Sequence, residues 1–223
     1  TDGHVRHIHD IGHGIEDDEG QLKFLIGLAT DVTEQMEAQR EVEQALQREQ
    51  QASQALQEQL RRDPLTGCLN RQALYEELQA QWNLYRRHQT TSTILFIDLN
   101  DFKQINDNHG HIAGDQAMLL LAEKLQQIIR ISDSLARYAG DEFVVVLPQT
   151  TVPEAQHVVD KIRREVLTFD TDDGCQVTVP FSIGLAFVGY PDISGPNSWV
   201  AAADQAMYLD KGRYRQVHQD PPA

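Results

Sequence analysis

The chain has 223 residues, 40% of them hydrophobic, and its 34 acidic and 19 basic side chains give a formal net charge of −15. This length suits one ordinary domain with an appendage, and the negative charge argues against a nucleic-acid partner, because nucleic acids bind basic surfaces. No apolar run approaches the roughly 20 residues that a membrane-spanning helix needs, so we expect no membrane segment. Cys68 and Cys175 lie far apart and match no metal-site spacing, which predicts reduced thiols in a cytoplasmic protein.

Residues 1–33 alternate β-prone runs with turn residues. Leu22–Ala29 is a predicted strand that follows an acidic turn, and Asp31–Glu34 opens a helix with a capping residue and an early acid. This order of strand, turn, strand and D-[IV]-T-E exit is similar to the C-terminal part of a PAS sensor domain, so residues 1–33 are expected to be a fragment of such a domain. His7 and His9 share one face of the first strand, where a solvated sheet face is favoured over a metal site.

Residues 34–62 are rich in Gln and Glu and contain no Gly or Pro, which predicts a long exposed helix. Small and apolar side chains follow steps of four and three along it, around a polar gap: Ala38, Val42, Ala45, Ala52 and Leu56. This weak heptad pattern predicts a signalling coiled coil of two parallel strands that joins two copies into a homodimer. A simple spacer helix is the alternative.

Asp63-Pro64 ends this helix, because proline lacks a backbone donor and disfavours helix at the residue before it. The elements predicted after it are helix Arg71–Arg87, strand Thr93–Leu99, helix Asp115–Ile129, strands Leu135–Tyr138 and Phe143–Leu147, helix Pro153–Leu167, strand Phe181–Phe187 and helix Trp199–Lys211. Without the first helix the order is βαββαβ, the α+β ferredoxin-like core, with one added helix at each end. Nucleotidyl cyclases and polymerase palms share this core, so it does not define a function. In this core the helices cover one face of an antiparallel sheet, and strand Thr93–Leu99 lies beside strand Phe143–Leu147.

The predicted hairpin of residues 135–147 carries two adjacent acids, Asp141 and Glu142, at its tip. Paired carboxylates on a tight turn suit a hard cation such as Mg²⁺, which prefers oxygen ligands; a solvated acidic turn is the alternative. The strand that ends in Asp98 lies next to this hairpin in the predicted sheet. All three carboxylates are therefore expected at one end of the sheet.

Residues 98–115 and 137–143 together resemble the GGDEF family of diguanylate cyclases. The family pattern is D-x-D-x-F-K-x-x-N-D-x-x-G-H-x-x-G-D followed by R-x-G-G-[DE]-E-F. The residues in register with it are Asp98, Phe102, Lys103, Asn106, Asp107, Gly110, His111, Gly114, Asp115, Arg137, Gly140, Asp141, Glu142 and Phe143. Asp63–Arg71 is similar to the entry motif D-x-L-T-G-L-x-N-R, with Cys68 in place of Leu. We therefore expect a GGDEF domain over residues 63–217, followed by a disordered tail over 218–223.

The resemblance implies that two GTP molecules are condensed into cyclic di-GMP and two pyrophosphates by a homodimer. It implies two Mg²⁺ ions per active site, with Mn²⁺ as a substitute, held by Asp98, the backbone carbonyl of Leu99, Asp141 and Glu142. It also implies that Asp141 accepts the proton and that Lys103 stabilises the transition state. The residues implied to bind substrate are Asn106, His111 and Asp115 around guanine, and Lys211 and Arg215 at the terminal phosphates.

The chain departs from the family pattern at several positions. Ala139 stands where the family usually has Gly, which excludes most positive-φ conformations. Near the C-terminus the family's A-D-x-A-[LM]-Y-x-A-K-x-x-G-R-N is matched with Asp210 for Ala, Tyr214 for Gly and Gln216 for Asn. A short deletion there would make Arg213, rather than Arg215, the phosphate ligand.

Arg130 and Asp133 resemble the family's inhibitory product site, which implies feedback by cyclic di-GMP; a local salt bridge is the alternative. A second hypothesis is a catalytically inactive module that binds GTP or cyclic di-GMP and passes a sensor signal to a partner. Ala139 and the altered C-terminal motif favour it, whereas the retained Lys103 and Asp141 favour an enzyme. A cyclase with a mononucleotide or mixed product is disfavoured by Asn106 and Asp115.

Overall fold

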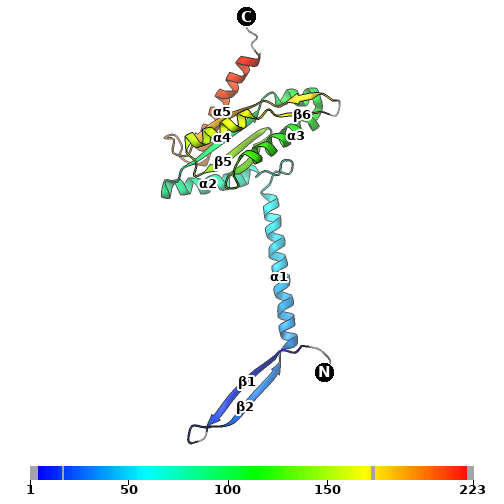
Figure 1. The fold of residues 1–223 in the computed structure, drawn as a ribbon, viewed down its shortest axis with the longest axis vertical. Helices are drawn as coiled ribbons and strands as arrows, with labels where there is room; N and C mark the ends of the chain where they lie inside the picture. Colours follow the sequence, from blue (N-terminus) through cyan, green and yellow to red (C-terminus); the bar gives the residue numbers. More distant parts are fainter. Residues whose placement is uncertain (1–4, 17, 172–173, 220–223) are drawn as a thin grey trace. The chain divides into compact units, whose positions relative to one another are not determined.

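The computed structural model describes residues 5–16, 18–171 and 174–219, which divide between Leu60 and Arg61 into two units (Figure 1). In the first unit β1 (Ile8–Glu16) pairs antiparallel with β2 (Leu22–Asp31), and α1 (Thr33–Leu60) follows with none of its residues buried. The carboxylate of Asp31 accepts hydrogen bonds from the backbone N–H of Thr33 at 3.0 Å and from its hydroxyl at 2.6 Å. The predicted hairpin, capping acid and long helix are therefore confirmed, while the PAS relationship and the pairing of α1 stay predictions.

The second unit is built on a four-stranded antiparallel sheet with strand order β4-β5-β3-β8. The strands are β3 (Ser92–Leu99), β4 (Ser134–Ala139), β5 (Glu142–Pro148) and β8 (Phe181–Phe187), and the helices are α2 (Arg71–His88), α3 (Phe102–Ile128), α4 (Val152–Arg164) and α5 (Pro196–Gln219). This arrangement confirms the ferredoxin-like α+β core and the predicted adjacency of β3 and β5.

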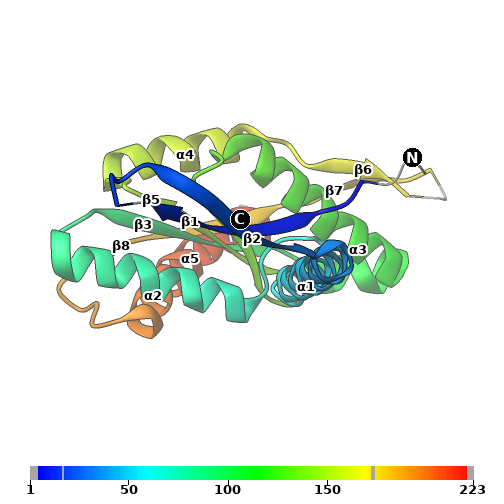
Figure 2. The same cartoon turned by 90° about the horizontal axis from the view of Figure 1, so that it is seen from below.

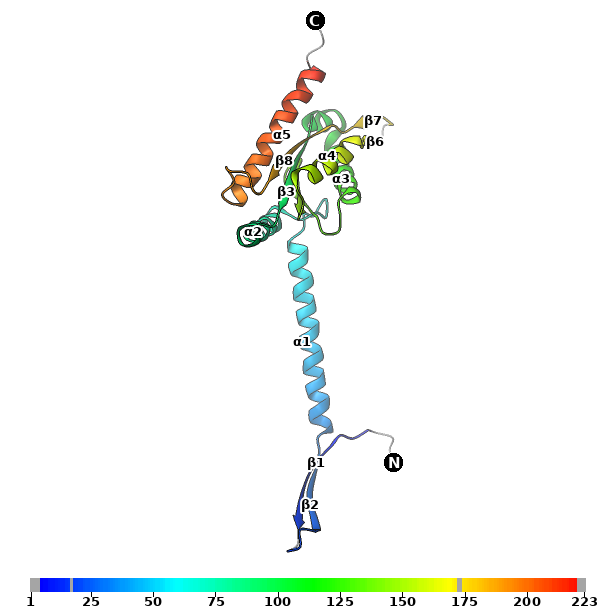
Figure 3. The ribbon, with the colours of Figure 1, turned by 60° about the vertical axis from the view of Figure 1, so that its left-hand side comes forward.

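Every residue of β3 is buried, because helices cover both faces of the sheet. Leu95, Ile97 and Leu99 belong to the apolar cluster that α3 and α4 complete, whereas Ile94 and Phe96 belong to the cluster of α2 and α5. Figures 2 and 3 show α3 and α4 on one side of the sheet and α2 and α5 on the other. The expectation that helices cover one face only is therefore wrong, since the two added helices bury the second face.

Three helices also have bounds that differ by three or more residues from the predictions; α5, for one, begins at Pro196 rather than at Trp199. Helix α3 begins at Phe102 rather than Asp115, with a kink at Gly110, whose φ of 82° and ψ of 167° are not helical. Helix α4 ends at Arg164, and a small hairpin of β6 (Thr168–Asp170) and β7 (Gln176–Thr178) follows it. These strands are too short to give a periodic pattern in the sequence.

The third difference is the end of α5, which continues to Gln219, beyond the predicted end at Lys211. It takes in residues 218–219 of the predicted disordered tail, whose remaining residues 220–223 lie outside the described part of the chain. A capping box begins α4, where the carboxylate of Glu154 accepts the backbone N–H of Thr151 at 2.8 Å.

Candidate active site

The acidic end of β3 meets the β4–β5 hairpin directly. In the antiparallel register Asp98 lies opposite Glu142, and the backbone N–H of Leu99 donates to the backbone carbonyl of Asp141 at 3.3 Å. Side chains alternate between the faces of a strand, so Asp98 shares the face of Phe96, on which α5 packs. The three predicted carboxylates are thus brought together, although Asp98 is distant from the other two in sequence.

Lys211 approaches these carboxylates from α5. Its Nζ forms an ion pair with Oδ1 of Asp98, and both side chains are largely buried, at 19% and 9% exposed. The sequence predicted Lys211 as a ligand of terminal phosphates and Asp98 as a metal ligand. Their direct contact brings the predicted phosphate ligand beside the predicted metal site, which suits a substrate whose phosphates bridge metal and protein.

Burial and mutual repulsion disfavour the ionised forms of two of these carboxylates. Burial raises the pKa of Asp141, and the neighbouring carboxylate of Asp98 raises it further, against opposing contributions from Lys211 and Arg137. Burial also raises the pKa of Glu142, with added repulsion from Asp98 and Asp141. A desolvated carboxylate crowded by others resists ionisation unless positive charge is supplied.

The donor set fits a divalent metal, since three carboxylates and the carbonyl of Leu99 are the hard oxygen ligands that Mg²⁺ prefers. Within the described ranges no group of three or more His, Cys, Asp or Glu side chains is already gathered in metal-holding geometry. In this arrangement the Lys211 ammonium group contacts Oδ1 of Asp98.

The hairpin tip is held from outside by Arg137. Its Nε donates to the carbonyl of Gly140 at 2.8 Å, and its Nη1 lies 3.1 and 3.2 Å from the two carboxylate oxygens of Asp63. Gly140 has a φ of 48°, whereas Ala139 is paired with Glu142 as part of β4 and is not among the described residues with positive φ. The Ala at 139 is therefore compatible with this backbone, which removes the conformational argument against an active enzyme.

The predicted guanine ligands lie along α3, on both sides of its kink. A Cβ atom added at Gly114 would lie 2.1 Å from Oδ1 of Asn106, so the Asn106 side chain occupies the space beside Gly114. Gly114 is the residue directly before Asp115. Lys103, His111 and Asp115 are exposed to solvent. Gly114 thus has a packing role, because its lack of a side chain lets Asn106 approach the segment that carries Asp115.

Arg130 and Asp133 form a turn at one side of a pocket of about 480 Å³. The Asp133 carboxylate accepts the backbone N–H of Arg130 at 2.8 Å, so this contact does not use the guanidinium group of Arg130. The pocket is lined by Arg62, Cys68, Leu69, Gln126, Ile129, Arg130, Ile131, Asp133, Ser134 and Leu135. Sequence reasoning missed Arg62 and Gln126, because only the fold brings these distant residues to Arg130.

Asn100 was also missed, although it stands at the second acidic position of the D-x-D pattern. It is 1% exposed, and the hydroxyl of Ser182 donates to its Oδ1 at 2.9 Å. Its Nδ2 is the one buried side-chain N or O atom without a hydrogen-bond partner in the described part of the chain. The sequence signal that could have identified it is an amide side chain, Asn100, at a position where the family pattern has an acid.

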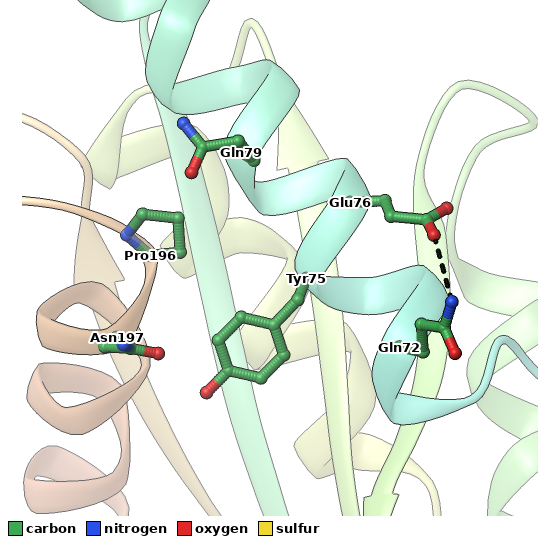
Figure 4. Close-up of a pocket in the computed structure, with 6 residues that line it drawn as sticks. All are labelled: Gln72, Tyr75, Glu76, Gln79, Pro196 and Asn197. Carbon is green, nitrogen blue, oxygen red and sulfur yellow. Dashed lines mark hydrogen bonds between the residues drawn. The ribbon is translucent and has the colours of Figure 1, made fainter.

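A second pocket, of about 620 Å³, lies between α2 and the start of α5 (Figure 4). Its lining residues are Gln72, Tyr75, Glu76, Gln79, Pro196 and Asn197. None of them is a predicted site residue. Figure 4 shows the Tyr75 ring on the side of α2 that faces Asn197. This pocket is therefore separate from the acidic group at the end of β3.

Residues 60–216 match the family model described as "Diguanylate cyclase, GGDEF domain". The chain belongs to this family, whose members generally use divalent metal ions. It is similar to the probable diguanylate cyclase DgcC of Escherichia coli, with 36% identity over 156 residues, 69% of this chain and 42% of the relative. It is also similar to the diguanylate cyclase DgcP of Pseudomonas aeruginosa, with 35% identity over 67% of this chain and 22% of the relative.

Solved structures agree with this assignment. The GGDEF domain of TpbB (YfiN) from Pseudomonas aeruginosa is 34% identical, with a TM-score of 0.63 over 68% of this chain and 89% of that one. The coiled coil and GGDEF domain of DgcB from Caulobacter crescentus, solved with c-di-GMP, shares the fold at 24% identity, with a TM-score of 0.73 over 80% of this chain and 95% of that one.

The chain spans less than half the length of the curated relatives named above. None of the helices in the described part of the chain is both long and apolar enough to cross a membrane.

Proposed function

We propose that this protein is a diguanylate cyclase that condenses two GTP molecules into cyclic di-GMP and two pyrophosphates. The observation that carries the proposal is the meeting of Asp98, Asp141 and Glu142 at one end of the sheet, with Lys211 against them. Carboxylates gathered with a lysine suit in-line attack of a substrate hydroxyl on a phosphate, with divalent cations held by the carboxylates.

The metal ligands in this proposal are Asp98, the carbonyl of Leu99, Asp141 and Glu142. Bound divalent cations would supply the positive charge that activates the 3′-hydroxyl and offsets charge on the leaving phosphates. We propose Mg²⁺, with Mn²⁺ as a substitute and two ions per site. Asp141 accepts the proton of the attacking hydroxyl in this proposal, because its carboxylate lies in the group that would hold the cations beside that hydroxyl. Lys103, exposed on the first turn of α3, stabilises the charge that develops on the attacked phosphate.

Guanine recognition falls to Asn106, His111 and Asp115. An Asp carboxylate accepts from N1–H and the exocyclic amine of guanine, and the Asn amide both donates and accepts. The packing of Asn106 against Gly114 supports this assignment, because it directs the amide toward the segment that carries Asp115.

The terminal phosphates of GTP are bound by Lys211 and Arg215 in this proposal. Because α5 is helical throughout this region, residues four apart lie on one face, so Arg215 follows Lys211 on the side near Asp98. Arg213, two residues from Lys211, points to a different side of the helix. This helical geometry supports Arg215 over Arg213 as the phosphate ligand.

Each copy holds one GTP, so the reaction requires two copies of the site. We propose a homodimer joined through α1 as a parallel coiled coil. Val42 and Leu56, in the apolar stripe of α1, are 68% and 57% exposed in the single chain, and pairing would bury them. Residues 1–33 act in this proposal as part of a PAS-like sensor that changes the pairing of α1.

Arg130 and Asp133 form a site for inhibition by the product. The pocket beside them, with the guanidinium groups of Arg62 and Arg130 and the amide of Gln126 on its lining, has the groups to bind phosphate and guanine. A product molecule bound there would hold two copies apart from the productive arrangement. Such feedback is a coupling free energy, which requires tighter binding to the separated arrangement.

The test is to incubate the purified chain with GTP and MgCl₂ and to identify the products by chromatography and mass spectrometry. We expect one cyclic di-GMP for every two pyrophosphates, and no product from the Asp141→Asn variant. A mononucleotide product would overturn the proposed reaction. Binding of GTP without turnover by the wild type, in the presence of either metal, would support the inactive nucleotide-binding module instead.

A further inference from the structure

Two residues that depart from the family pattern flank Lys211 on α5. Asp210 and Tyr214 stand where the pattern has Ala and Gly, and each side chain reaches another element of the second unit. Both are partly buried, unlike Arg213 and Arg215, which are exposed. The altered C-terminal motif is therefore built into the fold.

Asp210 ties α5 to both the edge and the far face of the sheet. Its Oδ2 accepts the backbone N–H of Ile183 at 3.0 Å, and Nη2 of Arg163 lies 2.8 Å from the same oxygen. Ile183 belongs to β8, an edge strand of the four-stranded sheet, and Arg163 belongs to α4, which lies on the opposite face from α5 (Figure 3). An alanine at position 210 can form neither contact.

Tyr214 ties α5 to the loop that carries the chemistry. Its hydroxyl donates to Oδ2 of Asp101 at 3.1 Å, and Asp101 is the N-cap residue of α3, between Leu99 and Lys103. Burial and the Asp101 carboxylate raise the pKa of Tyr214 to about 12, so the hydroxyl keeps its proton and remains a donor at neutral pH. A glycine at position 214 would lose this bond and would also weaken the helix.

The packing of α5 on β8 explains why such ties matter. A Cβ atom at Gly184 would lie 2.1 Å from the backbone carbonyl oxygen of Ala203 and from the backbone nitrogen of Met207. The helix backbone thus rests on the strand backbone at this point, without an intervening side chain to interlock with it. Sliding or rotation of α5 is opposed in its first half by buried side chains such as Trp199 and Met207, and in its second half by the hydrogen bonds of Asp210 and Tyr214.

We infer that Asp210 and Tyr214 are positioning residues that fix α5 on β8, α4 and the start of α3, so that Lys211 and Arg215 face the phosphate end of the GTP site. The inference rests on the proposed function in so far as these two cations bind GTP. In this inference, Asp210 and Tyr214 hold Lys211 and Arg215 in position, and this compensates for the Gly and Asn of the family pattern that this chain lacks.

The experiment compares wild type, Asp210→Ala and Tyr214→Phe, with Tyr208→Phe as a matched control, because Tyr208 is 65% exposed on the same helix. Binding of GTP and of GMP is measured by calorimetry, which does not depend on turnover. We expect GTP affinity to fall about tenfold in both variants, the size of one weakened hydrogen bond, with GMP affinity unchanged. Only the triphosphate reaches Lys211 and Arg215. The initial rates should show a higher KM for GTP and little change in kcat.

Several outcomes decide the inference. If GTP affinity is unchanged in both variants, or if GTP and GMP affinities fall together, Asp210 and Tyr214 are general structural contacts and the inference fails. If Asp210→Asn, which keeps an acceptor for Ile183, recovers part of the GTP affinity, the tie to β8 is supported. A wild type that binds GTP but makes no product would overturn the proposed function, while the ratio of GTP to GMP affinity would still decide this inference.

Discussion

Replacement of Arg137 by Ala should destabilise the second unit. It should also disturb the candidate active site, because Arg137 holds the hairpin tip that carries Asp141 and Glu142. The Arg137 guanidinium contacts both carboxylate oxygens of Asp63, the carbonyl of Gly140 and Sδ of Met118. The two charged side chains are only 18% and 17% exposed, so solvent screens them weakly. Hydrogen bonds to charged groups contribute about 1.5–3 kcal/mol, and Asp63 keeps its bonds from Thr66 in the variant. We therefore expect a loss of about 2–3 kcal/mol in the free energy of unfolding.

The pH dependence of this loss has a defined sign. Burial raises the pKa of Asp63, but the hydrogen bonds from Thr66 and Arg137 outweigh it and hold the pKa below the usual value. A carboxyl group with a lowered folded pKa contributes stability above its unfolded pKa and loses it as the pH falls through the folded pKa. The difference between wild type and Arg137→Ala should therefore shrink below a pH of about 4, the ordinary Asp value.

The assay is guanidinium unfolding followed by tryptophan fluorescence at neutral and acid pH. Both tryptophans, Trp82 and Trp199, lie in the second unit, so the signal reports that unit alone. Arg213→Ala, which removes an exposed arginine from α5, is the control for loss of one positive charge. A neutral-pH difference below about 0.5 kcal/mol, the usual size for surface substitutions, would refute the reasoning. If the difference in the free energy of unfolding stays constant as the pH falls below about 4, the Asp63 carboxylate is not its source.

The other predictions concern turnover. Asp141→Asn should abolish cyclic di-GMP synthesis with an unchanged far-ultraviolet circular dichroism spectrum, and a near-normal rate would contradict the metal and proton roles of Asp141. At limiting Mg²⁺, wild-type turnover should fall with acidification at a pH above that at which free carboxyl groups titrate, because protons compete with the metal for Asp141 and Glu142, whose pKa values are raised in the metal-free protein; a profile flat down to the ordinary carboxyl range would argue against this. Removal of residues 1–60 should make specific activity rise with protein concentration, unless sedimentation shows that the dimer persists without α1. Arg130→Ala should keep the initial rate and lose non-competitive inhibition by cyclic di-GMP, whereas inhibition that GTP competes away in the wild type would exclude the Arg130 site.

The adjacency of β3 and β5 was predictable because the βαββαβ order allows few sheet arrangements. From that order alone, Asp98 could be expected beside Asp141 and Glu142, and the register confirms that it lies opposite Glu142. The start of α3 was not predictable in the same way. Gly110 does interrupt the helix, as a glycine among polar residues suggests, but the residues before it are helical because Ile105 packs into the core.

Contacts between side chains far apart in the sequence could not be predicted from it. Lys211 and Asp98 are 113 positions apart, as are Tyr214 and Asp101. No local pattern relates such residues, and their contact depends on the face of the sheet that α5 covers. The family pattern supplied the identity of Lys211 as a ligand, but Asp210 and Tyr214 could be recognised there only as mismatches. The fold turns these mismatches into hydrogen bonds.

The net charge of the chain affects how it can bind GTP, which is itself negatively charged. With a net charge of −15 the protein repels GTP at long range, yet the opposing charges are unevenly placed. Lys211 is held beside Asp98, and Lys103 lies on the first turn of α3, near the same end of β3. Without divalent cations, the carboxylates of Asp98, Asp141 and Glu142 would repel the phosphates and compete with them for Lys211. Cations on those carboxylates would reverse both effects, so GTP affinity should rise steeply with Mg²⁺ concentration. Calorimetric GTP affinity that is the same in Mg²⁺ and in a chelator would show that Lys211 is already available to phosphate and that the acids do not guard the site.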